Sequence, residues 1–204
     1  MNDCFALLEE PRRPWVDLEA LKAKFLRLAS AMHPDHSHGA ADADQQDGRY
    51  AEMNAAYQCL RAPKERLAHL LELERGAKPG GIESVPADLM DLFMRVGELC
   101  RGADAFLAER AGTQSPLLKV QLFQRGMAWT DQLNALRQTL QARLAQLEQS
   151  LQAMNPAWDT APPMGIADRA AHLPLESLEQ IYRTISYLTR WTGQLQERIV
   201  QLSF

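Results

Sequence analysis

A leucine repeat in the second half of the chain constrains the fold more than any other feature. Between residues 133 and 154, apolar side chains recur at steps of three and four residues, which places them on one face of an α-helix. The repeat consists of Leu133, Leu136, Leu140, Leu144, Leu147, Leu151 and Met154. Its opposite face is rich in Gln and is expected to be solvated. The sequence therefore predicts a long amphipathic helix that packs against other helices.

Helices on both sides of this repeat are expected to complete a bundle. Pro86 can begin one helix, and Ser115-Pro116 is typical of a cap and first turn for the long helix itself. Residues 155–174 contain Pro156, Pro162, Pro163, Gly165 and Pro174, and are predicted to form a long loop. A last helix is predicted from about Pro174 to Leu202. Three helices joined in this way predict an elongated antiparallel bundle.

The choice of aliphatic residues also favours helices over strands. The 204 residues include 30 Leu and 29 Ala but only 5 Val and 5 Ile, so good helix formers far outnumber β-branched aliphatics. We therefore predict an all-α protein. A chain of this length is expected to hold one or two domains.

The N-terminal part has its own helical pattern. Apolar residues repeat from Asp17, a predicted cap, to Met32. Lys24 and Arg27 lie on the outward side of this helix and Lys22 flanks the apolar stripe, so the exposed face is basic. His33-Pro34-Asp35 ends it, because a residue before proline is disfavoured in the α region. A polar loop is predicted over 36–48, followed by two more helices, of which Pro63 opens the second and Gly76 ends it. The predicted domains are 1–75, a linker at 76–85, and a bundle at 86–204.

The sequence contains few signs of catalytic chemistry. It has no glycine-rich nucleotide motif, no GxSxG and no HExxH, so we predict that the protein is not an enzyme and needs no cofactor. Cys4, Cys59 and Cys100 are far apart in sequence and form no CxxC pair, which predicts neither a disulfide framework nor a thiolate zinc site. His33, His36 and His38 could bind a metal ion, but a solvated loop is the expectation.

Composition and charge limit the cellular context. No stretch is apolar for long enough to cross a membrane, and the N-terminus lacks the pattern of a signal peptide, so a cytoplasmic location without membrane attachment is expected. The formal net charge of −4 argues against nucleic acid as the main partner.

The N-terminal motifs resemble the J domain of DnaJ-type co-chaperones. The resemblance rests on an amphipathic helix with a basic face, the tripeptide His33-Pro34-Asp35 after it, and the run Met53-Asn54-Ala55-Ala56-Tyr57 in the next helix. It implies a helical hairpin with the HPD turn at its tip. It also implies that His33, Pro34, Asp35, Lys22, Lys24 and Arg27 contact a DnaK-type chaperone and trigger its ATP hydrolysis.

Residues 53–71 narrow the resemblance to the HscB subfamily, through an Asn, an aromatic residue, Leu-Arg, Pro, Arg and an apolar pair at the family's spacing. HscB proteins join a J domain to a three-helix bundle that binds the iron–sulfur scaffold IscU and delivers it to the chaperone HscA. The resemblance implies that scaffold binding involves Leu89, Met90, Phe93, Met94 and Tyr187. Where the family has glutamates near this apolar region, the chain has Met94, Gly97 and Arg101.

The sequence thus predicts a non-enzymatic co-chaperone of the iron–sulfur assembly branch. Three other hypotheses remain open at this point. The chain could be a general J-domain protein with a different client, or a metal-binding regulator that uses the histidine cluster at residues 33–38. It could also be a structural scaffold that dimerises through the long leucine-rich helix.

Overall fold

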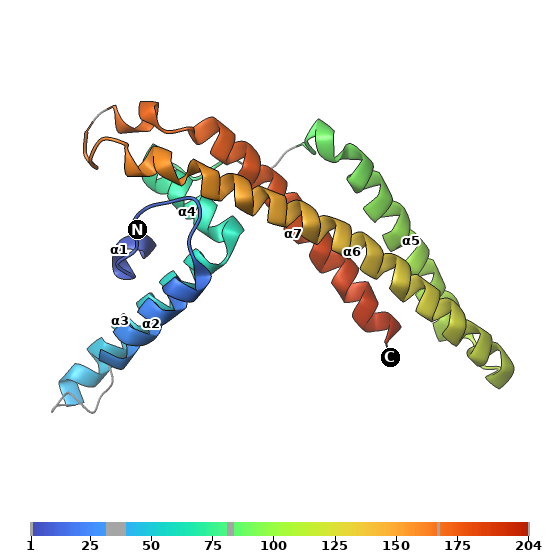
Figure 1. Ribbon diagram of the computed structural model, residues 1–204. Coiled ribbons are helices and arrows are strands. Elements are labelled where there is room, and N and C mark those ends of the chain that lie inside the picture. The colour runs from blue at the N-terminus through green and yellow to red at the C-terminus, as the bar shows by residue number, and fades with distance from the viewer. Residues whose placement is uncertain (1, 32–39, 81–83, 167, 204) are drawn as a thin grey trace. The chain divides into compact units, whose positions relative to one another are not determined.

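The protein is all-α. The computed structural model describes residues 2–31, 40–80, 84–166 and 168–203, and within these ranges it contains seven α-helices, short 3-10 helices and no strand (Figure 1). This confirms the predicted fold class. The helices are α1 (Cys4–Leu7), α2 (Leu18–Ala31), α3 (Ala40–Arg61), α4 (Pro63–Arg75), α5 (Met90–Gly112), α6 (Pro116–Asp159) and α7 (Leu175–Leu202), with 3-10 helices η2 (Ala87–Leu89) and η3 (Arg169–His172).

These elements form two compact units. Unit 1 contains Met1–Gly80 and Glu148–Tyr182, and unit 2 contains Gly81–Leu147 and Arg183–Phe204. The last turns of α6 and the first turns of α7 therefore belong to the unit of the N-terminal helices, whereas the sequence assigned them to the bundle. Among the described helices, none has both the length and the apolar character that a bilayer crossing requires.

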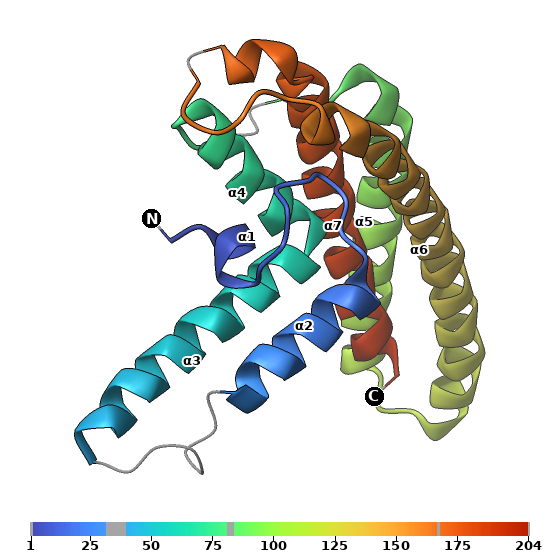
Figure 2. The same cartoon turned by 60° about the vertical axis from the view of Figure 1, so that its left-hand side comes forward.

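Helices α2 and α3 form a hairpin in unit 1 (Figure 2). The Asp17 carboxylate caps α2 by accepting the backbone N–H groups of Glu19 and Ala20 at 2.9 and 3.1 Å, as the sequence predicted. Phe25 of α2 stacks on Tyr57 of α3, with ring centroids 4.5 Å apart. Leu21, Met53, Ala56 and Leu60 are buried. The apolar periodicity of both helices thus predicted the faces that pack together.

Helix α3 begins earlier than the apolar pattern indicated. Its first residue is Ala40, whereas a loop was predicted as far as Gly48. The segment before Tyr50 is rich in Ala and Gln, which are good helix formers, and one interior glycine costs only about 1 kcal/mol. Because this stretch has no apolar stripe, periodicity could not mark the start of the helix.

The segment predicted as a long loop begins as helix and is anchored to the N-terminal region. Helix α6 continues through Pro156 to Asp159. The Asn155 side chain pairs with the backbone of Trp15: its amide donates to the Trp15 carbonyl at 3.0 Å and its oxygen accepts the Trp15 N–H at 3.1 Å. Arg169 forms a two-point ion pair with Glu74 of α4, at 2.9 and 3.0 Å. These contacts explain why this segment belongs to unit 1.

Unit 2 is a bundle of α5 with the adjoining parts of α6 and α7. Its core is built from one stripe of each helix, and the predicted leucine repeat supplies the α6 stripe. The buried residues include Val96, Ala103 and Phe106 of α5, Leu133, Leu136 and Leu140 of α6, and Leu188, Leu195 and Ile199 of α7. Arg198 of α7 donates to the Asp104 carboxylate of α5 at 2.7 Å, which raises the pKa of the guanidinium.

A glycine allows α5 and α6 to approach closely. A Cβ added at Gly102 would lie 2.3 Å from Cη2 of Trp129. We expect Gly102→Ala to lower the free energy of unfolding of unit 2 by about 1–2 kcal/mol, because the displaced indole outweighs the gain in helix propensity. Gly193→Ala is the matched control, since nothing lies within 4 Å of that Cβ position. Urea unfolding followed by circular dichroism would test this, and equal or higher stability of Gly102→Ala would contradict it.

Candidate functional site

The first candidate surface is the α2–α3 hairpin. The tripeptide His33-Pro34-Asp35 lies outside the described residues, and in the chain it stands between Ala31, the end of α2, and Ala40, the start of α3. The structure therefore supports the predicted helices on both sides of the motif. His36 and His38 of the histidine cluster also lie outside the described residues.

The predicted basic residues of α2 have different surroundings. Lys22 is exposed. Lys24 donates to the Glu9 carbonyl at 3.0 Å and pairs with the Glu10 carboxylate at 2.8 Å. The Arg27 guanidinium pairs with the Glu9 carboxylate. Two of the three cations thus contact the segment that follows α1, a pairing that helical periodicity alone could not reveal.

The two ion pairs differ in their exposure to solvent, and therefore in how easily a partner could replace the glutamate. The side chains of Arg27 and Glu9 are 60% and 58% exposed, and such a pair stabilises a protein by only about 0–1 kcal/mol. A partner's carboxylate can therefore replace Glu9 at little cost. The Glu10 side chain is only 10% exposed, so Lys24 mainly holds the α1–α2 connection in place. Lys22 and Arg27 are the cations of this face that are most available to a partner.

The second candidate surface is an apolar patch at the start of α5, which we call the α5 patch and define as Met90, Phe93 and Met94. Their exposed fractions are 45%, 42% and 52%. Leu89 was grouped with them by sequence, but it is fully buried and therefore does not form part of the exposed surface. Val96, seven residues after Leu89, is buried as well. Helix α5 thus has one stripe in the core and a second, exposed apolar face.

Aromatic contacts connect the α5 patch to α7. Phe93 lies 6.1 Å from the buried Trp191 ring, and Trp191 lies 5.4 Å from the half-buried Tyr187 ring. The Trp191 ring thus lies near both Phe93 and Tyr187 and connects them. Trp191 was not singled out as a site residue by sequence, although its spacing of four residues from Tyr187 places both on one face of α7.

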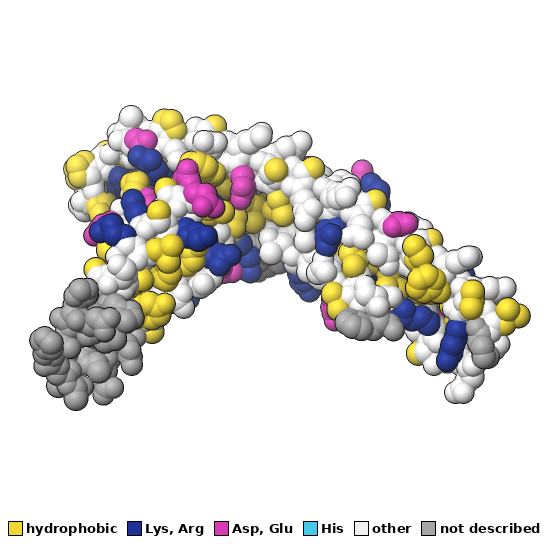
Figure 3. Space-filling view, turned by 60° about the horizontal axis from the view of Figure 1, so that its bottom comes forward, with side chains coloured by type: hydrophobic (Ala, Val, Ile, Leu, Met, Phe, Trp, Pro, Cys, Tyr) yellow, Lys and Arg dark blue, Asp and Glu magenta, His cyan; other side chains and the backbone are white. Residues whose placement is uncertain are grey.

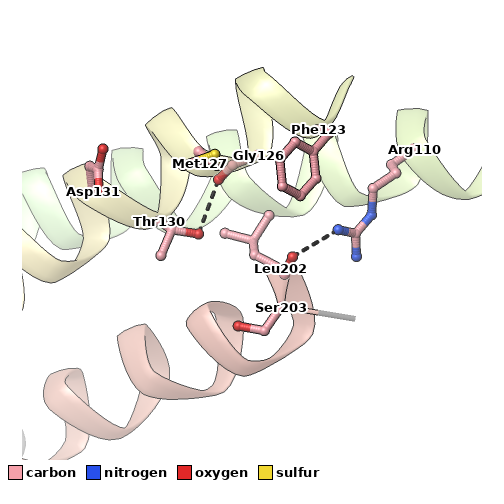
Figure 4. A pocket seen from close by; sticks show the side chains of 8 residues that line it. All are labelled: Arg110, Phe123, Gly126, Met127, Thr130, Asp131, Leu202 and Ser203. Carbon is pink, nitrogen blue, oxygen red and sulfur yellow. Dashed lines mark hydrogen bonds between the residues drawn. The ribbon is translucent and has the colours of Figure 1, made fainter. Parts of the chain in front are cut away.

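A third exposed apolar region lies on α6. Hydrophobic side chains are exposed toward the end of unit 2 where α5 and α6 meet (Figure 3), and the residues include Leu117, Val120, Phe123 and Met127. Phe123 and Met127 border a pocket next to the end of α7, where the Arg110 guanidinium donates to the Leu202 carbonyl at 2.9 Å (Figure 4). None of these residues is among the site residues predicted from the sequence.

Comparisons of sequence relate part of the chain to J-type co-chaperones. It is 36% identical over 80 residues to the mitochondrial J-type co-chaperone jac1 of Schizosaccharomyces pombe, covering 39% of this chain and 32% of that protein. It is 39% identical over 71 residues to a co-chaperone protein HscB homolog of Acinetobacter baylyi, covering 35% of this chain and 40% of that protein. A chaperone protein DnaJ of Zymomonas mobilis is 36% identical over 67 residues, 33% of this chain and 16% of that protein. The matches thus span well under half of these relatives, and no model of a protein family matches the chain.

Comparisons of structure extend over nearly the whole chain. The crystal structure of human co-chaperone protein HscB aligns with 98% of this chain and 81% of its own, with a TM-score of 0.59 and 16% identity. Chaperone HscB from Vibrio cholerae aligns with 96% of this chain and 98% of its own, with a TM-score of 0.50 and 18% identity. The chain therefore has the fold of HscB, and together with its sequence relatives this confirms the predicted resemblance to HscB-like co-chaperones of the DnaJ superfamily.

Proposed function

We propose that this protein is a non-enzymatic co-chaperone that stimulates a DnaK- or HscA-type ATPase and presents a client to it. The observation that carries the proposal is the α2–α3 hairpin, packed through Phe25 and Tyr57, with His33-Pro34-Asp35 in the sequence between its helices. The HscB fold and the J-type relatives support the same function.

The hairpin is suited to an acidic partner surface. Lys22 is exposed and Arg27 is held only by an exposed ion pair, so both can attract carboxylates of the chaperone. Proline restricts the backbone at Pro34, and the Asp35 carboxylate can accept two hydrogen bonds from a partner arginine. His33 completes the motif through which the family acts on its chaperone.

The α5 patch is the proposed client surface. Exposed Met and Phe side chains adapt to partner surfaces, and a cluster of them on one helix is typical of a protein-binding site. Trp191 and Tyr187 support Phe93 from α7, which limits the side-chain freedom lost on binding. The proposed client is an IscU-like iron–sulfur scaffold, and the proposed binding residues are Met90, Phe93, Met94 and Tyr187.

Both surfaces on one chain would couple the client to the chaperone. A client held on the α5 patch is kept at high effective concentration near a chaperone held by the hairpin, so two weak contacts act as one stronger one. The test is the steady-state ATPase rate of a DnaK- or HscA-type chaperone, measured with and without the chain. Stimulation that increases further with an IscU-like protein supports the proposal, whereas no stimulation at a saturating concentration of the chain contradicts it.

Removal of the α5 patch is expected to weaken client binding. For the double variant Phe93→Ser, Met94→Ser we expect the Kd of an IscU-like scaffold to rise at least about tenfold, because a few well-packed residues near the centre of an interface supply most of the binding free energy, and losing about 1.4 kcal/mol raises the Kd tenfold. Isothermal titration calorimetry would measure this change. ATPase stimulation without client should stay unchanged, since neither residue belongs to the hairpin.

The third apolar region provides a matched control. Phe123→Ser, Met127→Ser removes the same residue types from side chains that are 69% and 55% exposed. This control should leave the Kd within about twofold of the original chain. Equal weakening by both double variants would contradict the α5 patch as the client site. No binding of the scaffold by the original chain would indicate a J-domain protein with a different client.

A further inference from the structure

Two of the cysteines meet a histidine in unit 1, although they are far apart in sequence. Cys4 begins α1, Cys59 lies near the end of α3 and His69 lies in the middle of α4. One ligand atom from each, the two sulfurs and a ring nitrogen, all lie within 4.8 Å of one another. Among the described residues, these three side chains form a group of sulfur and nitrogen ligands that could hold a metal ion.

Two contacts with α1 fix the position of the His69 side chain. The His69 Nε2 atom accepts the backbone N–H of Cys4 at 3.0 Å, which places the ring beside the Cys4 side chain. The Phe5 ring stacks on the His69 ring with centroids 6.0 Å apart. His69 is only 8% exposed, and both cysteines are half-buried. The three side chains are thus presented by three helices that pack together.

The site is accessible from solvent. A surface pocket of about 290 Å³ is lined by Cys59 and His69 together with Glu65, Glu72, Lys78 and Tyr182. An ion could enter through this pocket, and a water molecule from it could serve as a further ligand. No side chain of the proposed hairpin surface or of the α5 patch lines it.

The surroundings of the two thiols shift their pKa values in opposite directions. The Cys59 thiol donates to the Glu65 carbonyl at 3.7 Å. The pKa of Cys4 is lowered, chiefly by the neighbouring Cys59 side chain and also by His69. The pKa of Cys59 is raised, chiefly by the neighbouring Cys4 side chain and by burial. Thiolate is the form of cysteine that binds metals, so a metal ion at this site would bind the two sulfurs in their deprotonated form.

We propose that Cys4, Cys59 and His69 form a binding site for a zinc(II) ion, with a water molecule in the fourth position. Zinc favours tetrahedral sites of thiolate and imidazole ligands. Bonds of about 2.0–2.3 Å require ligand atoms roughly 3.5–3.8 Å apart, so atoms that now lie within 4.8 Å of one another need to approach by at most about 1.3 Å. On binding, the Cys59 thiol and any protonated Cys4 thiol release their protons to solvent, and the His69 nitrogen gives up its hydrogen bond from the Cys4 N–H to bind the metal. The ion would tie α1 to α3 and α4.

Cobalt(II) substitution and zinc titration test the site in the full chain. We expect a zinc stoichiometry of one per chain, a higher Tm with zinc than with chelator, and ultraviolet charge-transfer bands from thiolate to cobalt(II). Cys4→Ser and Cys59→Ser should each weaken zinc binding at least tenfold and remove most of the charge-transfer intensity, since even groups that only orient a ligand affect affinity by about 10–100-fold.

Matched controls distinguish zinc bound at this site from zinc bound by other side chains of the chain. Cys100→Ser removes a buried cysteine of unit 2 and should leave zinc affinity unchanged. Zinc bound only by the histidines at residues 33–38 would produce no thiolate bands, and this result would overturn the proposal. The proposal would also be overturned if Cys4→Ser bound zinc with the same affinity as the original chain. A Cys4–Cys59 disulfide and no bound zinc, in protein purified under reducing conditions, would overturn it as well.

Discussion

His33→Gln is expected to abolish stimulation of a DnaK- or HscA-type ATPase while the fold stays intact. The rate with the variant should fall to the basal rate of the chaperone alone, because His33 begins the tripeptide through which J domains act. Steady-state ATP hydrolysis, measured over a range of variant concentrations, would show whether the maximal rate or only the affinity is lost. Circular dichroism and Tm should match those of the original chain.

Two further variants separate the role of the motif from that of the charges. His172→Gln changes an exposed histidine of η3 in the same unit and should keep full stimulation. Lys22→Ala should raise the chain concentration needed for half-maximal stimulation, with a smaller difference at high salt, because exposed charges mainly affect encounter with the partner. Full stimulation by folded His33→Gln would contradict the J-domain function.

Arg66→Ala is expected to lower the free energy of unfolding of unit 1 by about 3 kcal/mol. The side chain is 1% exposed and joins two separate segments: Nε donates to the Pro14 carbonyl at 2.9 Å and Nη1 to the Leu60 carbonyl at 2.6 Å. Burial lowers the pKa of this guanidinium to about 10, so it stays charged at neutral pH. Its removal leaves a cavity and two buried carbonyls without a donor, each of which costs about 1–3 kcal/mol.

Hydrogen exchange measured peptide by peptide would show which helices lose stability in Arg66→Ala. Protection should fall in α1, α3 and α4, and stay unchanged in the part of α5 that contains Val96 and Phe106, which belongs to unit 2. Arg49→Ala is the control, since Arg49 is exposed on α3 and the change should cost at most about 0.5 kcal/mol. If Arg66→Ala is as stable as this control, Arg66 does not hold the Pro14 segment to the end of α3.

Local patterns predicted most of the secondary structure. The cap at Asp17, the first-turn proline Pro63, the stop at Gly76 and the leucine stripe of α6 all follow from residue types and spacing within one helix, and the structure confirms them. The start of α3 at Ala40 was missed because a polar helix has no apolar stripe. The exposure of Met90, Phe93 and Met94 was also predictable, since one helix cannot bury two faces in a single core.

The sequence by itself determined that this chain is all-α, where most of its helices lie and which residues carry the J-domain resemblance. These properties depend on helix propensity and on the spacing of apolar side chains along one helix. Only the tertiary structure decided that Glu9 and Glu10 pair with Arg27 and Lys24, that Leu89 is buried while the α5 patch is exposed, and that Cys4, Cys59 and His69 meet. Each of these depends on which helices pack together, because side chains from different helices become neighbours only when the core forms.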